Sequence, residues 1–334
     1  MVDDKDDDIS KLSRKMLSPS RIALQVLGFL VGLGLLYFCL EKAIGNADWT
    51  LVRDAEPWLL VSLVFFGLLS TVLDGFVFWG VLMPYRRLKA REVQGVNMSA
   101  AFLNYAPIRL GTVFRIAYHA KVDRIGIVPI LSWFVAITIT TMACMASISA
   151  ATLATGAKGL AFPVLIAVFL VLSGFILWGL AKLPIVHRLA AGKEKMIGDP
   201  RALAIGLLGR LLVLASNCAR MGIAVAILNL NLGMRDVILL SVVGLLASFN
   251  PLGRVGWREW TLALLTPYLA AESLAGGNPE AVDAISSQLV LIESAGEVIA
   301  ILPLGLFTLI WAMRRLLKSS PAADRDSAKP VIDS

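Results

Sequence analysis

Long apolar runs separated by short polar breaks dominate the chain. Six runs approach or exceed the roughly 20 residues that a helix needs to cross a bilayer. They cover about residues 22–40, 57–83, 127–153, 160–181, 202–230 and 284–313. The first run is too long for the core of a signal peptide, so we interpret it as a span. The pattern therefore predicts an all-α polytopic membrane protein with about six transmembrane helices.

Two further apolar stretches are too short to cross. Residues 95–106 and 237–249 stay apolar for only about a dozen positions and then meet Pro, Gly and Arg. Short, interrupted segments are typical of re-entrant helical hairpins, which bring the number of hydrophobic segments to eight. The alternative is a set of eight ordinary spans, two of them kinked at proline.

The charges that flank the runs predict the topology. Lys and Arg gather at positions 11–21, 86–91 and 314–318, whereas the loop between the first two runs is acidic. Because cytoplasmic loops are rich in Lys and Arg, both termini are predicted to lie in the cytoplasm. The first hairpin then opens from the cytoplasmic side and the second from outside.

Each half of the chain contains two spans, a hairpin and a third span, and the halves start on opposite sides. This order predicts an inverted repeat, in which matching interrupted segments mark a binding site near the membrane midplane. We divide the chain into a cytoplasmic N-terminal tail, two membrane repeats and a cytoplasmic C-terminal tail. Their boundaries are 1–20, 21–156, 157–315 and 316–334.

The composition excludes several classes of protein. With 57% hydrophobic and 16% charged residues and a mean hydropathy of +0.77, the chain has no room for a soluble domain. The net charge of +7 lies in clusters beside the apolar runs, so we expect no nucleic-acid partner. Three separate cysteines and two interfacial histidines predict neither a metal site nor a cofactor.

Two short motifs follow the interrupted segments. The first is NYAPIRLGTVFR at residues 104–115, and the second is FNPLGRVGWREW at residues 249–260. Each contains Asn, Pro, Arg and Gly in the same order. With these motifs the chain resembles the flippase-like transmembrane domain family, which includes the membrane part of lysylphosphatidylglycerol synthase and stand-alone relatives, over roughly residues 21–315.

The resemblance implies particular functional positions. The first family motif falls on Pro107, Arg109, Gly111 and Arg115. The second falls on Pro251, Gly253, Gly256, Arg258 and Glu259. It departs from the family pattern at Arg254, where a further glycine is expected. Pro107, Gly111, Pro251, Gly253 and Gly256 are expected to form the hairpin turns. Since the chain shows no soluble aminoacyl-transferase domain, we do not expect it to be an enzyme.

Ten ionisable residues fall at predicted membrane depth. At about 3 kcal/mol each, facing lipid would cost about 30 kcal/mol, which exceeds the roughly 5–15 kcal/mol that stabilises a fold. They must therefore face one another, a wet cavity or a ligand. The six arginines are Arg109, Arg115, Arg210, Arg220, Arg254 and Arg258, and the four carboxylates are Asp74, Glu259, Glu293 and Glu297.

The excess of arginine over carboxylate favours a phosphate ligand, because guanidinium groups match phosphate oxygens. Helical spacing supports a shared face, since Arg210, Asn217 and Arg220 form one stripe and Ser286, Glu293 and Glu297 form another. The carboxylates would support the site or link it to protons. The alternative interpretation is structural ion pairing.

Three functional hypotheses remain from the sequence. The first is a lipid translocase that handles an anionic phosphate head group by alternating access at an arginine-lined midplane site. The second is a membrane-embedded lipid-modifying or glycosyltransferase-accessory protein that binds a polyprenyl-phosphate lipid. The third is a scaffold. We expect a bacterial inner (cytoplasmic) membrane location and a membrane lipid as partner. A homo-oligomer or a separate lipid-modifying enzyme stays open.

Overall fold

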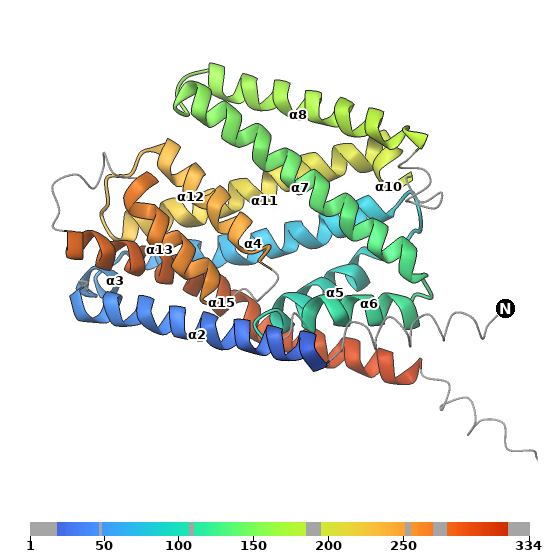
Figure 1. Cartoon of the computed structure of the whole chain (residues 1–334), viewed down its shortest axis with the longest axis horizontal. Coiled ribbons are helices and arrows are strands. Elements are labelled where there is room, and N and C mark those ends of the chain that lie inside the picture. The colour runs from blue at the N-terminus through green and yellow to red at the C-terminus, as the bar shows by residue number, and fades with distance from the viewer. Residues whose placement is uncertain are drawn as a thin grey trace, which may run out of the picture.

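The computed structural model describes residues 19–46, 49–106, 110–184, 195–250, 255–269 and 279–319. Regular structure in these ranges is helical (Figure 1), which confirms the predicted fold class. The helices are α2 (Pro19–Asn46), α3 (Thr50–Arg53), α4 (Pro57–Leu82), α5 (Ala90–Leu103), α6 (Leu110–Lys121), α7 (Ile127–Thr155), α8 (Ala161–Ala181), α10 (Lys195–Gly198), α11 (Pro200–Ile227), α12 (Met234–Ala247), α13 (Trp257–Leu269) and α15 (Pro279–Lys318).

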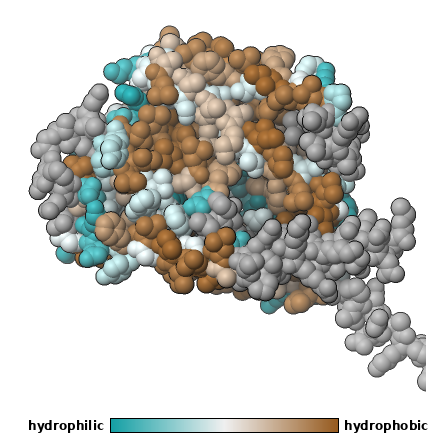
Figure 2. Space-filling model, in the orientation of Figure 1, coloured by the Kyte–Doolittle hydropathy of each residue, from teal (hydrophilic) through white to brown (hydrophobic). Residues whose placement is uncertain are grey.

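Six of these helices are long and apolar enough to cross a bilayer, which confirms the predicted number of spans. The candidate spans are Ala23–Gly45, Pro57–Leu82, Ile127–Thr155, Ala161–Ala181, Pro200–Ile227 and Val282–Lys318. Apolar side chains cover much of the face seen in Figure 2, and many large hydrophobic side chains are exposed, as expected where lipid is the solvent. The chain is therefore a multi-pass membrane protein.

The segments predicted to be re-entrant form two pairs of short helices. The helices α5, α6, α12 and α13 have 14, 12, 14 and 13 residues. At 1.5 Å per residue each is about 18–21 Å long, less than the roughly 30 Å of hydrocarbon in a bilayer. None is a candidate span.

Each short pair folds back on itself. In the first pair α6 packs so closely on α5 that a Cβ on Gly111 would overlap the carbonyl oxygen of Ala100. In the second, a Cβ on Gly244 of α12 would lie 3.1 Å from Leu262 of α13. This folding is what a hairpin requires. The depth of each pair in the membrane and the side to which it opens stay predictions.

The centre of the bundle is formed by α4 and α11, and α15 packs against α2, α4 and α5 (Figure 1). Gly67 of α4 and Gly296 of α15 meet at a close crossing, where a Cβ on Gly67 would lie 2.7 Å from the Gly296 carbonyl oxygen. Small residues let membrane helices approach in this way. The crossing brings the polar residues of α4 and α15 to one level.

The helices of the two halves pack in a corresponding way. Taken in order, α2, α4, α5, α6 and α7 of the first half correspond to α8, α11, α12, α13 and α15 of the second. The last helix of each half contacts the first three of the other half: α7 packs on α8, α11 and α12, and α15 packs on α2, α4 and α5. This exchange is what a two-fold related pair of repeats produces. The inverted orientation itself stays a prediction.

Candidate functional site

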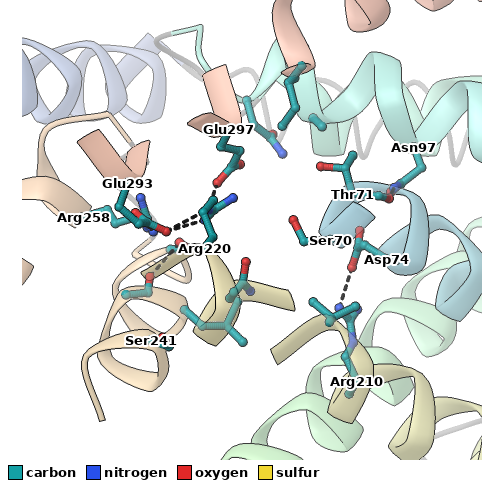
Figure 3. A pocket seen from close by; sticks show the side chains of 18 of the residues that line it. Ser70, Thr71, Asp74, Asn97, Arg210, Arg220, Ser241, Arg258, Glu293 and Glu297 are labelled. Atoms are coloured by element: carbon teal, nitrogen blue, oxygen red, sulfur yellow. Dashed lines mark hydrogen bonds and ion pairs between the residues drawn. The ribbon is translucent and has the colours of Figure 1, made fainter. Parts of the chain in front are cut away.

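A polar cavity of about 180 Å³ lies between the two halves, and Figure 3 shows the side chains around it. Helices α4, α5, α6, α11, α12, α13 and α15 contribute to its wall. The polar lining residues are Ser70, Thr71, Asp74, Asn97, Asn104, Arg115, Arg210, Asn217, Arg220, Ser241, Ser248, Arg258, Glu293 and Glu297. Polar groups inside a membrane protein gather where they pair with one another or contact water or a ligand.

The cavity collects most of the ionisable residues singled out in the sequence. Arg115, Arg210, Arg220 and Arg258 line it, together with Asp74, Glu293 and Glu297. The fourth predicted carboxylate, Glu259, lies beside Arg258, with 3.7 Å between its Oε1 and the Arg258 Nη1. The remaining predicted residues, Arg109, Arg254, Pro107, Pro251 and Gly253, lie outside the described residues.

One wall of the cavity is held by α4, α5, α6 and α11. Arg210 of α11 pairs with Asp74 of α4, with 2.5 Å between Nη1 and Oδ1. Arg115 of α6 donates to the Asn97 side-chain oxygen of α5 at 2.6 Å. Its guanidinium also lies 3.8 Å from the centre of the Phe78 ring, a cation–π contact. No carboxylate within the described ranges forms an ion pair with Arg115, which is held instead by neutral groups.

The opposite wall is an ion-pair network that joins α11, α13 and α15 (Figure 3). Arg220 lies 2.6 Å from Glu293 and 3.1 Å from Glu297. Arg258 contacts the second oxygen of Glu293 at 2.5 Å. Arg220 and Glu293 are each only 1% exposed. Neighbouring carboxylates repel unless a cation intervenes, and here Arg220 lies between Glu293 and Glu297.

Residues of the second motif have different roles. Glu259 accepts hydrogen bonds from the backbone N–H of Gly256 and the hydroxyl of Ser294, both at 2.8 Å. Gly256 has φ +78°, and a Cβ there would overlap the carbonyl of Gly32 in α2. The Trp257 indole donates to the Gly28 carbonyl oxygen at 2.9 Å. Gly256 and Trp257 therefore join the start of α13 to α2, while Arg258 faces the cavity.

Three cavity arginines keep a buried N–H group without a partner. The atoms are Arg115 Nε, Arg210 Nε and Arg220 Nη1, and the buried side-chain oxygen of Asn104 is likewise unpaired. Among the described residues four arginines meet four carboxylates. The charges of these eight residues balance, and the other two predicted arginines, Arg109 and Arg254, lie outside the described residues.

A comparison with known families supports the resemblance inferred from the motifs. The model of the lysylphosphatidylglycerol synthase TM region matches residues 25–277, which is more than half of the chain. The chain belongs to this family. No curated protein and no solved structure gives a match. Both motifs fall within the matched range, whereas Glu293 and Glu297 on α15 lie beyond it.

In this member of the family, sequence reasoning missed the neutral polar part of the wall. Asn97 and Ala101 of α5 and Asn104, the residue after its end, line the cavity at i, i+4 and i+7. This spacing gives one helix face and was a usable signal. By contrast, Ser70 and Thr71 sit in an apolar span whose pattern gives no sign that they face a cavity.

His119 stands apart from the cavity. His119, near the end of α6, is 1% exposed, and its Nδ1 lies 2.6 Å from a carboxylate oxygen of Asp123. Burial lowers the pKa of His119, against the opposing effect of Asp123. This imidazole therefore has a structural contact of its own. His187 lies outside the described residues.

Proposed function

We propose that this protein is a lipid translocase, which binds a lipid with an anionic phosphate head group in the central cavity and moves it by alternating access. The observation that carries the proposal is the set of unpaired guanidinium N–H groups on both walls of the cavity. We place the protein in the bacterial inner membrane with both termini in the cytoplasm. This role requires no catalysis, in keeping with carboxylates that are already engaged by guanidinium groups.

The unpaired groups favour a phosphate ligand on energetic grounds. Leaving a buried donor unpaired costs about 1–3 kcal/mol, and more when the group is charged. Arg115, Arg210 and Arg220 each carry such a donor. Phosphate oxygens accept several charge-assisted hydrogen bonds at once, so a phosphate or its ester suits a cavity lined by guanidinium groups.

Alternating access is supported by the corresponding packing of the two halves. One wall of the cavity depends on Asp74 of α4 in the first half, and the other on Glu293 of α15 in the second. Helix α11 carries an arginine to each wall, Arg210 and Arg220. A rocking motion of one half against the other would open the site to either side in turn. An accessory protein that only presents a polyprenyl-phosphate lipid would have no need for this correspondence.

A transport assay tests the proposal. The full chain is reconstituted into phosphatidylcholine vesicles that contain a fluorescent phosphatidylglycerol, and a membrane-impermeant reductant quenches the outer leaflet. We expect the quenched fraction to rise from the outer-leaflet share to nearly all of the label. A fluorescent neutral glycolipid, which has no phosphate, serves as the control cargo. Quenching that stays at the outer-leaflet share in protein-containing vesicles would overturn the translocase proposal.

Labelling of single cysteines tests the predicted topology. The native Cys39, Cys144 and Cys218 are first replaced by Ala, and one cysteine is then placed next to Arg109 or Gly253. The two short pairs are predicted to open to opposite sides. An impermeant thiol reagent should therefore reach the cysteine next to Arg109 from the cytoplasm and the cysteine next to Gly253 from outside. Labelling of both positions from one side only would contradict the inverted repeat.

A further inference from the structure

The first helix of each half, α2 or α8, has different neighbours in the two halves. Both pack on the last helix of the other half, α2 on α15 and α8 on α7. Beyond this shared contact α2 packs on α13, whereas α8 packs on α10 and α11. In Figure 1 α8 lies along the top and α6, the counterpart of α13, lies low on the right, with α7 between them. Helix α8 therefore stands away from the helix that a symmetric arrangement would place beside it.

The contact that the two halves share is held by polar groups. Lys42, near the end of α2, pairs with Asp283 of α15, with 2.5 Å between Nζ and Oδ2. Ser147 of α7 and Ser173 of α8 share a hydrogen bond between oxygens 3.1 Å apart. Polar contacts of this kind stabilise the association of membrane helices. Each of these two contacts is suited to act as a pivot for its first helix.

The joint between α2 and α13 is close. A Cβ on Gly32 of α2 would overlap the carbonyl oxygen of Val255, and a Cβ on Gly256 would overlap the carbonyl of Gly32. The Trp257 indole also donates to a backbone carbonyl of α2 at 2.9 Å. Helix α2 therefore closes the outer flank of α13, the helix that carries Arg258 into the cavity wall.

The packing of α8 within its own half is loose by comparison. An apolar groove of about 430 Å³ lies between α8 and α11. Phe175 and Trp178 of α8 line it, together with Leu203 and Leu208 of α11. On α6, which has no first helix against it, Ala117 is partly exposed. A movement of α8 away from α11 would therefore break little close packing and could cover α6.

We propose that α2 and α8 are the two gates of transport, with α2 closed on α13 in this structure and α8 open. In the other state α8 turns about α7 until it covers α6, while α2 turns about α15 and leaves α13. The inference rests on the proposed function and adds the moving parts to it. Inverted repeats reach their second state when the halves exchange conformations. The uncovered flank of α6, which carries Arg115, is then the lipid entrance on the side of the first hairpin.

Distances between spin labels test the exchange. The three native cysteines are replaced by Ala, and the full chain is labelled at Ala117 of α6 and Ile176 of α8. A second protein is labelled at Tyr37 of α2 and Leu264 of α13. Double electron–electron resonance in phosphatidylglycerol nanodiscs should give two distances for each pair, which differ by roughly 10 Å, the spacing of packed helices. The longer α6–α8 distance should predominate, as should the shorter α2–α13 distance.

Gly32→Ala is the variant that should change these populations. Its added Cβ meets the Val255 carbonyl only while α2 lies on α13, so the ratio of short to long α6–α8 distances should rise roughly tenfold. Gly34→Ala is the matched control on the same helix, since a Cβ there meets no atom within 4 Å. Trp257→Phe removes the indole hydrogen bond to α2 and should act in the same direction by a smaller factor. It keeps the test decisive if Gly32→Ala folds poorly.

Cross-links distinguish the gate from the pivot. Phe38→Cys with Leu264→Cys places thiols on α2 and α13 around one small cavity, where a short, reducible bifunctional reagent can bridge them. This bridge should stop the transport of fluorescent phosphatidylglycerol until a reductant cleaves it. A disulfide between Ser147→Cys and Ser173→Cys joins α8 to α7 and should leave at least about half of the transport rate.

The outcomes separate the gates from the proposed function. Unchanged α6–α8 distances in both α2 variants, or transport that continues with α2 bridged to α13, would overturn the gates and leave the translocase intact. Loss of transport in the protein cross-linked between α7 and α8 would overturn the pivot. Two distances for each pair without any transport of phosphatidylglycerol would overturn the translocase and uphold the paired movement of α2 and α8.

Discussion

Glu293→Gln is expected to lower the melting temperature by roughly 10 °C, which corresponds to about 3–5 kcal/mol. Glu293 contacts two cavity arginines, Arg220 and Arg258, and it is 1% exposed. Its neutralisation removes the nearer carboxylate of both guanidinium groups, which leaves Arg220 with Glu297 at 3.1 Å and Arg258 with Glu259 at 3.7 Å. Thermal unfolding in detergent, followed by tryptophan fluorescence, measures the change.

Glu92→Gln is the matched control for Glu293. Glu92 pairs with Arg315 at 2.7 Å in a contact whose arginine side chain is 39% exposed. Because solvent reaches this arginine, the pair should contribute only about 0–1 kcal/mol, and the melting temperature of Glu92→Gln should stay near that of the parent. A Glu293→Gln protein that melts with the control would mean that the two arginines are stabilised in another way. If transport by this variant keeps the parent pH profile, Glu293 is not the proton-linked group.

Arg115→Lys is expected to weaken the binding of phosphate lipids roughly tenfold to hundredfold, with little loss of stability. Lysine keeps the charge above Phe78 but loses the guanidinium fork and the unpaired Nε donor. Since no described carboxylate forms an ion pair with Arg115, no buried anion is stranded. Lipid titration and thermal unfolding of the same preparation measure the two effects separately.

Arg315→Lys controls for the chemical change. Arg315 pairs with Glu92 and is no part of the cavity wall, so the variant should bind lipid like the parent. The opposite pattern for Arg115→Lys, a lower melting temperature with unchanged lipid preference in the folded fraction, would assign Arg115 to the architecture.

The structure thus divides a set of arginines that the sequence could only treat together. Arg220 and Arg258 share Glu293 and hold three helices, so a change at either position strands a charge. Arg115 is held by Asn97 and Phe78. Whether an arginine substitution lowers stability or lipid binding depends on whether the arginine contacts a carboxylate or a neutral group. These contacting groups come from distant parts of the chain.

The spans were predictable because hydropathy is a local property. A helix in lipid satisfies its own backbone, so a run of about 20 apolar residues such as 57–83 is sufficient evidence for a span. Observed α4 ends one residue before the predicted boundary. The observed helix Pro279–Lys318 is longer than the predicted run 284–313. Polar residues lie in its first and last turns, and a hydropathy pattern does not count such residues as part of a span.

The fold class, the six spans, the two interrupted segments and the presence of charges that lipid cannot accommodate were all predictable from the sequence. Those conclusions need only composition, length and spacing within one segment. Only the packing of the helices places Arg220 between Glu293 and Glu297, Asn97 beside Arg115, and Asn104 in the cavity wall. These relations join residues 18–77 positions apart, and only the packing of helices brings such residues within hydrogen-bonding distance.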